Sequence, residues 1–185
     1  MKNRLLPTLS AALLTAYCWA EVPEPLTCSD VIKGSVKEVW TAITTKEGQE
    51  SWMVSHSEVD LRVGGLMRTQ YAKEGKIGDP NTINNLIISF DPERMFSIKI
   101  DKPPVRFPWK KAAESVWTVI YFEKVSDKET RVTVRMLGWT DDDESKAMRK
   151  FFEAGNKQTL DELKAYFAKK VVGPERGSLP HHKGH

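Results

Sequence analysis

The stretch that decides the architecture is "TDDDESKAMRKFFEAGNKQTLDELKAYFAKK", residues 140–170. At about 100° per residue, its apolar and small residues recur on one side of a helix. The acidic run over residues 141–144 suits the positive end of a helix dipole. We therefore predict one long helix whose buried side lies against a sheet. That side comprises Met148, Phe152, Gly155, Asn156, Thr159, Leu163 and Tyr166, flanked by Leu160 and Phe167.

The start of the domain has a strand pattern followed by helix signals. "LTCSDVIKG", residues 26–34, predicts a first strand. Ser35 is a favourable cap for a helix over residues 36–44, where apolar side chains recur at helical spacing. A second short helix is expected within residues 45–53.

The segment "SEVDLRVGGLMRTQY", residues 57–71, alternates polar and apolar side chains around a glycine pair. Val59, Leu61 and Val63 fall on one side, as in a half-buried strand that leads into a hairpin at residues 64–65. Such a glycine pair usually supplies positive φ for the turn rather than a ligand contact.

Two further hairpins are expected. Residues 84–100 read as two strands that turn at 91–94, and residues 115–139 as two strands that turn at 126–129. Residues 101–114, which contain three prolines, are expected to be a loop.

The last hairpin also gives an expected register. If Arg131 and Arg135 face solvent, plain antiparallel pairing through the turn puts Trp117, Val119 and Tyr121 on the inward side. The element order is a strand, two small helices, several antiparallel strands and a long helix. That order predicts an α+β fold in one domain.

The first twenty residues have the form of a secretory signal. Lys2 and Arg4 precede a short apolar run, and the segment ends on small Ala20. We expect cleavage after Ala20 and export, to the periplasm in a bacterium or to the medium. A lipoprotein reading, in which Cys18 carries the lipid, is disfavoured by the bulky Tyr17 before it.

Removal of this signal leaves a leader over residues 21–25, a domain over 26–170 and a tail over 171–185 that we expect to be disordered. It also leaves 28 − 2 = 26 basic residues against 25 acidic ones, a net charge of about +1. A near-neutral domain is a poor candidate for nucleic-acid binding. No later segment is apolar enough for membrane insertion, and Cys28 alone cannot form an intrachain disulfide.

Five segments, taken in order, resemble a known superfamily. They are "VWTAITTKEGQESWM", "EVDLRVGGLMR", "FDPERMFSI", "RVTVRMLGW" and "QTLDELKAYF". They are similar to the SRPBCC, or START-like, superfamily with the helix-grip fold, and within it to homologues of the activator of heat-shock-chaperone ATPase. The resemblance covers roughly residues 26–168 and implies a curved antiparallel sheet around the last helix. The fold would enclose an elongated apolar cavity, which in many members binds lipids, sterols or aromatic compounds.

One position departs from the pattern. The branch often carries Gly-Trp in the middle of the last helix, where this chain has Gly155-Asn156. Apolar walls interrupted by a few polar groups are typical of a binding site. We therefore predict a cavity that binds a small hydrophobic or amphipathic ligand, with no cofactor and no metal. The predicted ligand-binding residues are Trp52, Met67, Tyr71, Ile98, Trp117, Tyr121, Phe152 and Asn156.

Two other functions stay open. An enzyme of cyclase or hydrolase type would use His56 or a buried tyrosine, although the sequence contains no serine elbow, phosphate loop or paired-cysteine metal motif. We therefore name no catalytic residue. A chaperone-binding module is the second alternative, and the export signal disfavours it. The aromatic residues also fit a solid core.

Overall fold

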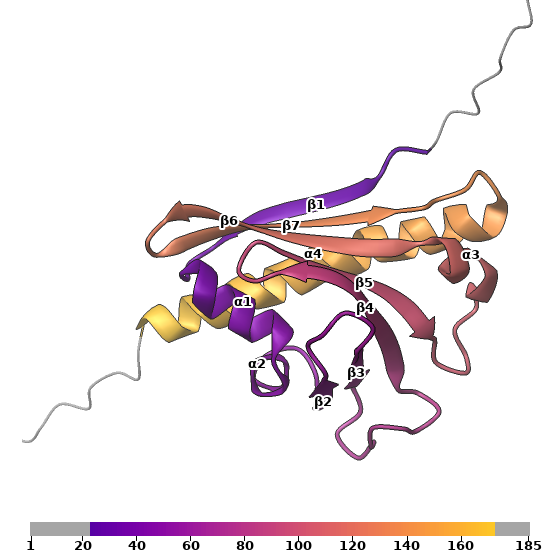
Figure 1. The fold of residues 1–185 in the computed structure, drawn as a ribbon, viewed down its shortest axis with the longest axis horizontal. Helices are drawn as coiled ribbons and strands as arrows, with labels where there is room; N and C mark the ends of the chain where they lie inside the picture. The colour runs from indigo at the N-terminus through magenta and orange to yellow at the C-terminus, as the bar shows by residue number, and fades with distance from the viewer. Residues whose placement is uncertain (1–22, 173–185) are drawn as a thin grey trace, which may run out of the picture.

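The protein is described by a computed structural model that covers residues 23–172, with side chains over 23–170. The proposed signal, residues 21–22 of the leader and residues 173–185 of the proposed tail lie outside the described residues. Seven strands form one antiparallel sheet in the order β1-β7-β6-β5-β4-β3-β2 (Figure 1). The strands are β1 Leu26–Ile32, β2 His56–Val59, β3 Leu66–Gln70, β4 Ile83–Asp91, β5 Met95–Lys102, β6 Trp117–Ser126 and β7 Glu129–Leu137.

Four helices accompany the sheet: α1 Val36–Thr44, α2 Lys46–Glu50, α3 Lys110–Ser115 and α4 Asp143–Val172. Ser35 caps α1 in a capping box with Glu38, as expected from the sequence. Asp142 accepts a hydrogen bond from the Ser145 backbone N–H at 3.0 Å, so the acidic run serves the start of α4. The α+β helix-grip fold is confirmed.

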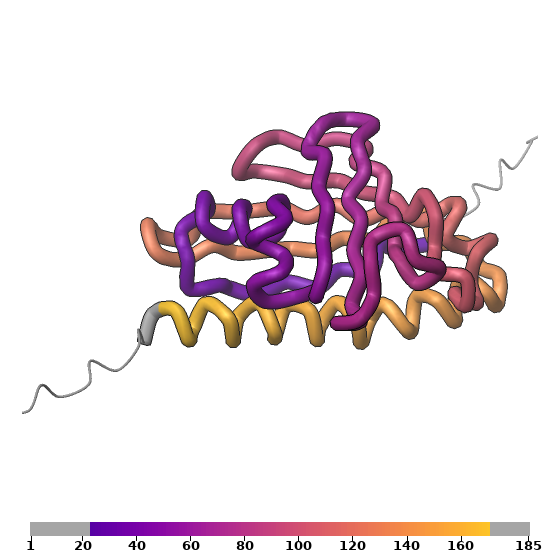
Figure 2. Tube along the Cα trace, turned by 90° about the horizontal axis from the view of Figure 1, so that it is seen from below, coloured from indigo at the N-terminus to yellow at the C-terminus, as the bar shows by residue number. Residues whose placement is uncertain are grey.

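The long helix runs the length of the molecule along the sheet (Figure 2). Its predicted inward side is buried or half-buried throughout. Near its C-terminal end, Leu163 and Phe167 join the main core with Trp40 of α1 and with Phe96 and Phe122 of the sheet. Trp40 and Phe122 meet edge to face, with ring centroids 5.2 Å apart. A second cluster around Met148 and Trp139 fills the other end.

The first hairpin differs from its prediction. The strand β2 ends at Val59, so Leu61 and Val63 are 36% and 63% exposed rather than buried on one side. The turn begins early because the Asp60 N–H bonds to the Leu66 carbonyl and the Arg62 N–H bonds to the Asp60 carbonyl. The glycine pair acts structurally, since Gly64 has a φ of +80°.

The prediction of which β6 residues face inward is wrong by one position. Val119 pairs with Arg135 and Tyr121 with Thr133, so both lie on the outer face of the sheet with the arginines, where neighbouring side chains bury Val119. Thr118, Ile120 and Phe122 face inward instead. The cause is a register shift between Lys124 and Ser126, which adds one residue next to the turn and reverses the alternation beyond it.

The proline-rich segment also holds more structure than expected. Its last five residues and Ser115 form the short helix α3, which buries Ala112 and Ala113. The Ala112 N–H donates to the Glu144 carboxylate at 3.1 Å, so α3 is held against the start of α4. The predicted turns at residues 91–94 and 126–129 are confirmed, since β5 begins at Met95 and β7 at Glu129.

Candidate functional site

A cavity of about 500 Å³ lies between the inner face of the sheet and the middle of α4. This volume suits a small organic ligand. Strands β3 to β7 supply one wall, α4 supplies the opposite wall, and α2 and the loop after β5 close the ends. The sheet contributes mainly Ile, Val and Met side chains because every second residue of each strand faces inward.

Seven of the eight predicted ligand-binding residues border the cavity: Trp52, Met67, Tyr71, Ile98, Trp117, Phe152 and Asn156. Tyr121 lies on the outer face of the sheet and does not border the cavity, which follows from the register shift in β6. By strand alternation Trp117 lies on the same face of β6 as Tyr121. Because Trp117 is the first residue of the strand, it still borders the cavity at one end.

The α2 end of the cavity is fixed by hydrogen bonds that the sequence did not indicate. The buried Gln49 amide donates to the Ile43 carbonyl at 2.7 Å and to the Met67 sulfur at 2.9 Å. Its oxygen accepts from the Ser57 hydroxyl at 2.6 Å. The Trp52 indole N–H donates to the Ala42 carbonyl at 3.0 Å. These bonds hold Gln49 and Trp52 in place as wall residues.

Asn156 projects from α4 into the cavity, and its side-chain amide donates to the Met136 sulfur at 3.3 Å. A thioether is a weak acceptor, so the amide keeps hydrogen-bonding capacity. One residue earlier, a Cβ added to Gly155 would meet no atom within 4 Å. The small side chains at positions 155 and 156 therefore leave the middle of the cavity open.

Aromatic side chains mark where the cavity meets solvent. Tyr71 and Phe151 are 58% and 53% exposed although both border the cavity. Phe151 continues a chain of rings, with its centroid 5.1 Å from Trp109 and 5.3 Å from Phe152.

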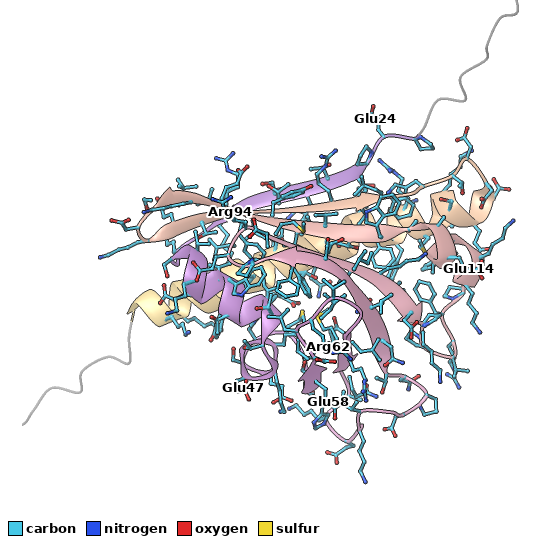
Figure 3. All side chains as sticks on the ribbon, in the orientation of Figure 1. Glu24, Glu47, Glu58, Arg62, Arg94 and Glu114 are labelled. Atoms are coloured by element: carbon cyan, nitrogen blue, oxygen red, sulfur yellow. The ribbon has the colours of Figure 1, made fainter. Side chains whose placement is uncertain are left out.

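The titratable residues that border the cavity are Tyr71 and Lys99. Strand alternation directs the Lys99 side chain to the outer face, because its neighbours Ile98 and Ile100 face inward. The acidic side chains Glu24, Glu47 and Glu114 lie on the periphery of the molecule (Figure 3). The cavity walls are therefore mostly apolar, with uncharged polar groups between them.

The residues considered for catalysis lie elsewhere. The Nε2 atom of His56 is 2.9 Å from the Lys73 carbonyl oxygen, outside the cavity. Cys28 borders a separate groove of about 320 Å³ between β1 and α4. Burial and the nearby Asp161 carboxylate raise the pKa of the Cys28 thiol, so it is held in its less nucleophilic form.

The His, Cys, Asp and Glu side chains of residues 23–170 contain no group of three that could hold a metal ion. Among the helices that the structure describes, none is long and apolar enough to cross a membrane.

Several solved structures share the fold. A protein from Staphylococcus saprophyticus is 14% identical, with a TM-score of 0.60 over 80% of this chain and 93% of that chain. The Aha1 dimer from Colwellia psychrerythraea is 15% identical, with a TM-score of 0.55 over 77% and 97%. An AHSA1-like protein from Aeromonas hydrophila is 16% identical, with a TM-score of 0.55 over 86% and 99%. At these identities the likeness concerns the fold alone.

A search of curated proteins found no match. The family model described as "Activator of Hsp90 ATPase homolog 1-like protein" matches residues 33–168, which include all the cavity-wall residues and the buried hydrophobic core except Leu26 and Ile32. The order of strands, the long terminal helix and this match agree with the resemblance found in the five sequence segments. The chain belongs to the family of activator of Hsp90 ATPase homolog 1-like proteins, within the SRPBCC superfamily.

Proposed function

We propose that this protein binds a small hydrophobic or amphipathic ligand, a lipid or an aromatic compound, in the cavity between the sheet and α4. The observation that carries the proposal is a cavity of about 500 Å³ with mostly apolar walls. It stays open beside α4 because Gly155 and Asn156 have small side chains there. Burial of apolar ligand surface supplies the driving force, at roughly 25 cal/mol per Å².

A non-catalytic carrier or sensor fits the walls better than an enzyme does. General acid–base catalysis needs a titratable group within hydrogen-bond reach of the reacting atom. The titratable groups among the wall residues are the Tyr71 hydroxyl and the Lys99 amine, and strand alternation turns Lys99 toward the outer face. The wall residues include no carboxylate, imidazole or thiol. We also propose export, on the basis of the signal-like segment at residues 1–20, so the ligand would be met outside the cytoplasm.

The proposal is tested by filling the cavity. Asn156→Trp places an indole in the open space, so it should weaken binding of the neutral dye Nile red at least tenfold. Because the new side chain replaces empty space with contacts, the melting temperature should hold or rise. Gln158→Trp is the matched control, since it puts the same side chain on the exposed side of α4. It should bind Nile red as the wild type does.

Two results would overturn the proposal. One is a wild type that binds no Nile red and, in native mass spectrometry of the freshly purified protein, carries no small molecule. The other is a strong destabilisation by Asn156→Trp together with unchanged dye binding, which would mean that the space is filled in solution.

A protein-binding module is the alternative that the family description favours. Such a role needs a surface that meets the partner, and it does not need an open cavity. Fractionation of the source cells separates the two proposals, because the chaperone is cytosolic. A native product retained in the cytosol would favour the module, and a product that begins at Glu21 outside the cytosol would favour the carrier.

A further inference from the structure

Two groups of uncharged polar side chains border the cavity and keep hydrogen-bond donors or acceptors available for a ligand. The first group is Thr118 and Asn156. Thr118 pairs directly across the sheet with Met136, and the Met136 sulfur accepts the Asn156 amide at 3.3 Å. The Thr118 hydroxyl forms no hydrogen bond to another described residue. The two side chains therefore flank Met136 and present a hydroxyl and an amide to the cavity.

The second group is Thr69 and Asn85, on adjacent strands. Asn85 pairs with Met67, and Thr69 lies two residues further along β3 on the same face. Thr69 is only 3% exposed, yet neither its hydroxyl nor the Asn85 amide bonds to another described residue. Since every fully enclosed polar side-chain atom of the described residues has a partner, these atoms open onto the cavity.

The two groups lie at different places along the sheet. Thr118 pairs with Ile98 on β5, and two residues on, Ile100 pairs with Asn85 on β4. Two strand spacings sideways and two residues lengthwise separate Thr118 from Asn85 by roughly 12 Å. The side chains between them on the inner face are Ile98 and Ile100. The cavity thus alternates polar, apolar and polar along one direction.

We infer that the cavity selects uncharged, elongated ligands that carry a hydrogen-bonding group at each end, such as a hydroxyl or a carbonyl, over ligands with a carboxylate or ammonium head. This inference rests on the proposed function. Lys99 is the one cationic residue among the described residues that border the cavity, and strand alternation turns its side chain toward the outer face. An ionised head at either polar group would therefore be buried without an adjacent counter-charge. A hydroxyl or carbonyl is satisfied by Thr and Asn side chains, which donate and accept.

The test uses four rigid probes with one shared body: biphenyl, 4-hydroxybiphenyl, 4,4′-dihydroxybiphenyl and 4′-hydroxybiphenyl-4-carboxylate. Each displaces Nile red from the wild type at pH 7.5. We expect the carboxylate to bind at least 30-fold more weakly than the diol, and its affinity to rise as lower pH protonates it. A carboxylate that binds as tightly as the diol overturns the inference.

Two near-isosteric variants then identify the side chains that bind the two hydroxyls of the diol. Asn85→Leu and Thr118→Val each remove one of the two hydrogen-bonding side chains at one end of the diol, so each should lower diol affinity about tenfold. Biphenyl affinity should hold or rise in both, because the walls become more apolar. Thr27→Val, on the outer face of β1, is the control and should change neither affinity.

The outcomes separate this inference from the proposed function. Biphenyl binding with diol affinity unchanged in both variants overturns the two-ended selectivity and leaves the binding cavity intact. A wild type that binds neither Nile red nor any biphenyl overturns both. The comparison of probes on the wild type decides the charge preference even where a variant fails to fold.

Discussion

The two halves of α4 share one helix and one sequence pattern but meet the sheet differently. Toward the C-terminus, Leu163 and Phe167 are 1% and 2% exposed and pack into a closed core. In the middle, Phe152, Asn156 and Thr159 are half-buried and border the cavity. The same inward stripe thus forms a solid interface near its C-terminal end and the wall of a hollow in its middle.

The difference arises from what faces the helix. Opposite the closed half, three aromatic side chains, Trp40, Phe96 and Phe122, fill the space. Opposite the open half, the strands present shorter side chains such as Ile98 and Thr118. Because protein interiors pack at nearly constant density, smaller groups at fixed backbone spacing leave a cavity. The volume of the facing side chains, and not the helix pattern, decides which half is hollow.

The largest expected effect compares Phe167→Ala with Phe152→Ala. The first removes a fully packed ring and should lower the free energy of unfolding by about 3–5 kcal/mol. The second removes a ring that already borders empty space, so its cost should be less than half as large. Denaturant unfolding of both variants measures the difference. Equal losses would show that the middle of α4 is as tightly packed as its end.

An intermediate effect comes from two glycines: Gly34, which contacts the closed half of α4, and Gly155, which lies in the open half. A Cβ at Gly34 would lie 2.6 Å from Cε1 of the packed Phe167 ring, so Gly34→Ala should destabilise by about 1–3 kcal/mol. A Cβ at Gly155 meets nothing, so Gly155→Ala should stabilise the helix by about 1 kcal/mol. Thermal unfolding gives the sign of each. A destabilising Gly155→Ala would mean that the space beside it is occupied.

The smallest effect concerns an ion pair that ties the closed half to the edge of the sheet. Lys164 donates to both Asp30 carboxylate oxygens at 2.8 Å. This bond and the nearby positive charge hold the Asp30 pKa below its ordinary value of 3.8. A lowered pKa in the folded state stabilises the protein above that ordinary value, and the stabilisation is lost as pH falls through the folded-state pKa.

Lys164→Met should therefore cost up to about 1 kcal/mol at pH 7, since the lysine is half exposed and solvent weakens the pair. The cost should be smaller at pH 2, because protonation of Asp30 removes its attraction to the lysine. Urea unfolding at the two pH values measures it, with Lys150→Met, an exposed lysine on the same helix, as the control. A loss that is equal at both pH values would assign the effect to packing of the lysine stem.

Much of the site was accessible from sequence, and the exceptions have identifiable causes. Helical spacing placed Phe152 and Asn156 on the inward side of α4 because a helix has one fixed period. Tyr121 was misplaced because a register shift beside a turn reverses every residue beyond it, and no residue type in that turn signals the shift. Gln49 was missed because a polar residue on a short helix normally faces solvent, whereas here its partners come from three separate segments.

The sequence by itself determined the α+β order, the capping of α1, the long helix and its inward stripe. These depend on local periods and on side chains that bond within one turn, which neighbouring residues specify. Only the tertiary structure decided the register of β6, the early turn after β2 and the existence of the cavity. Each of these depends on which residues from distant segments oppose one another, and on the volume that they leave between them.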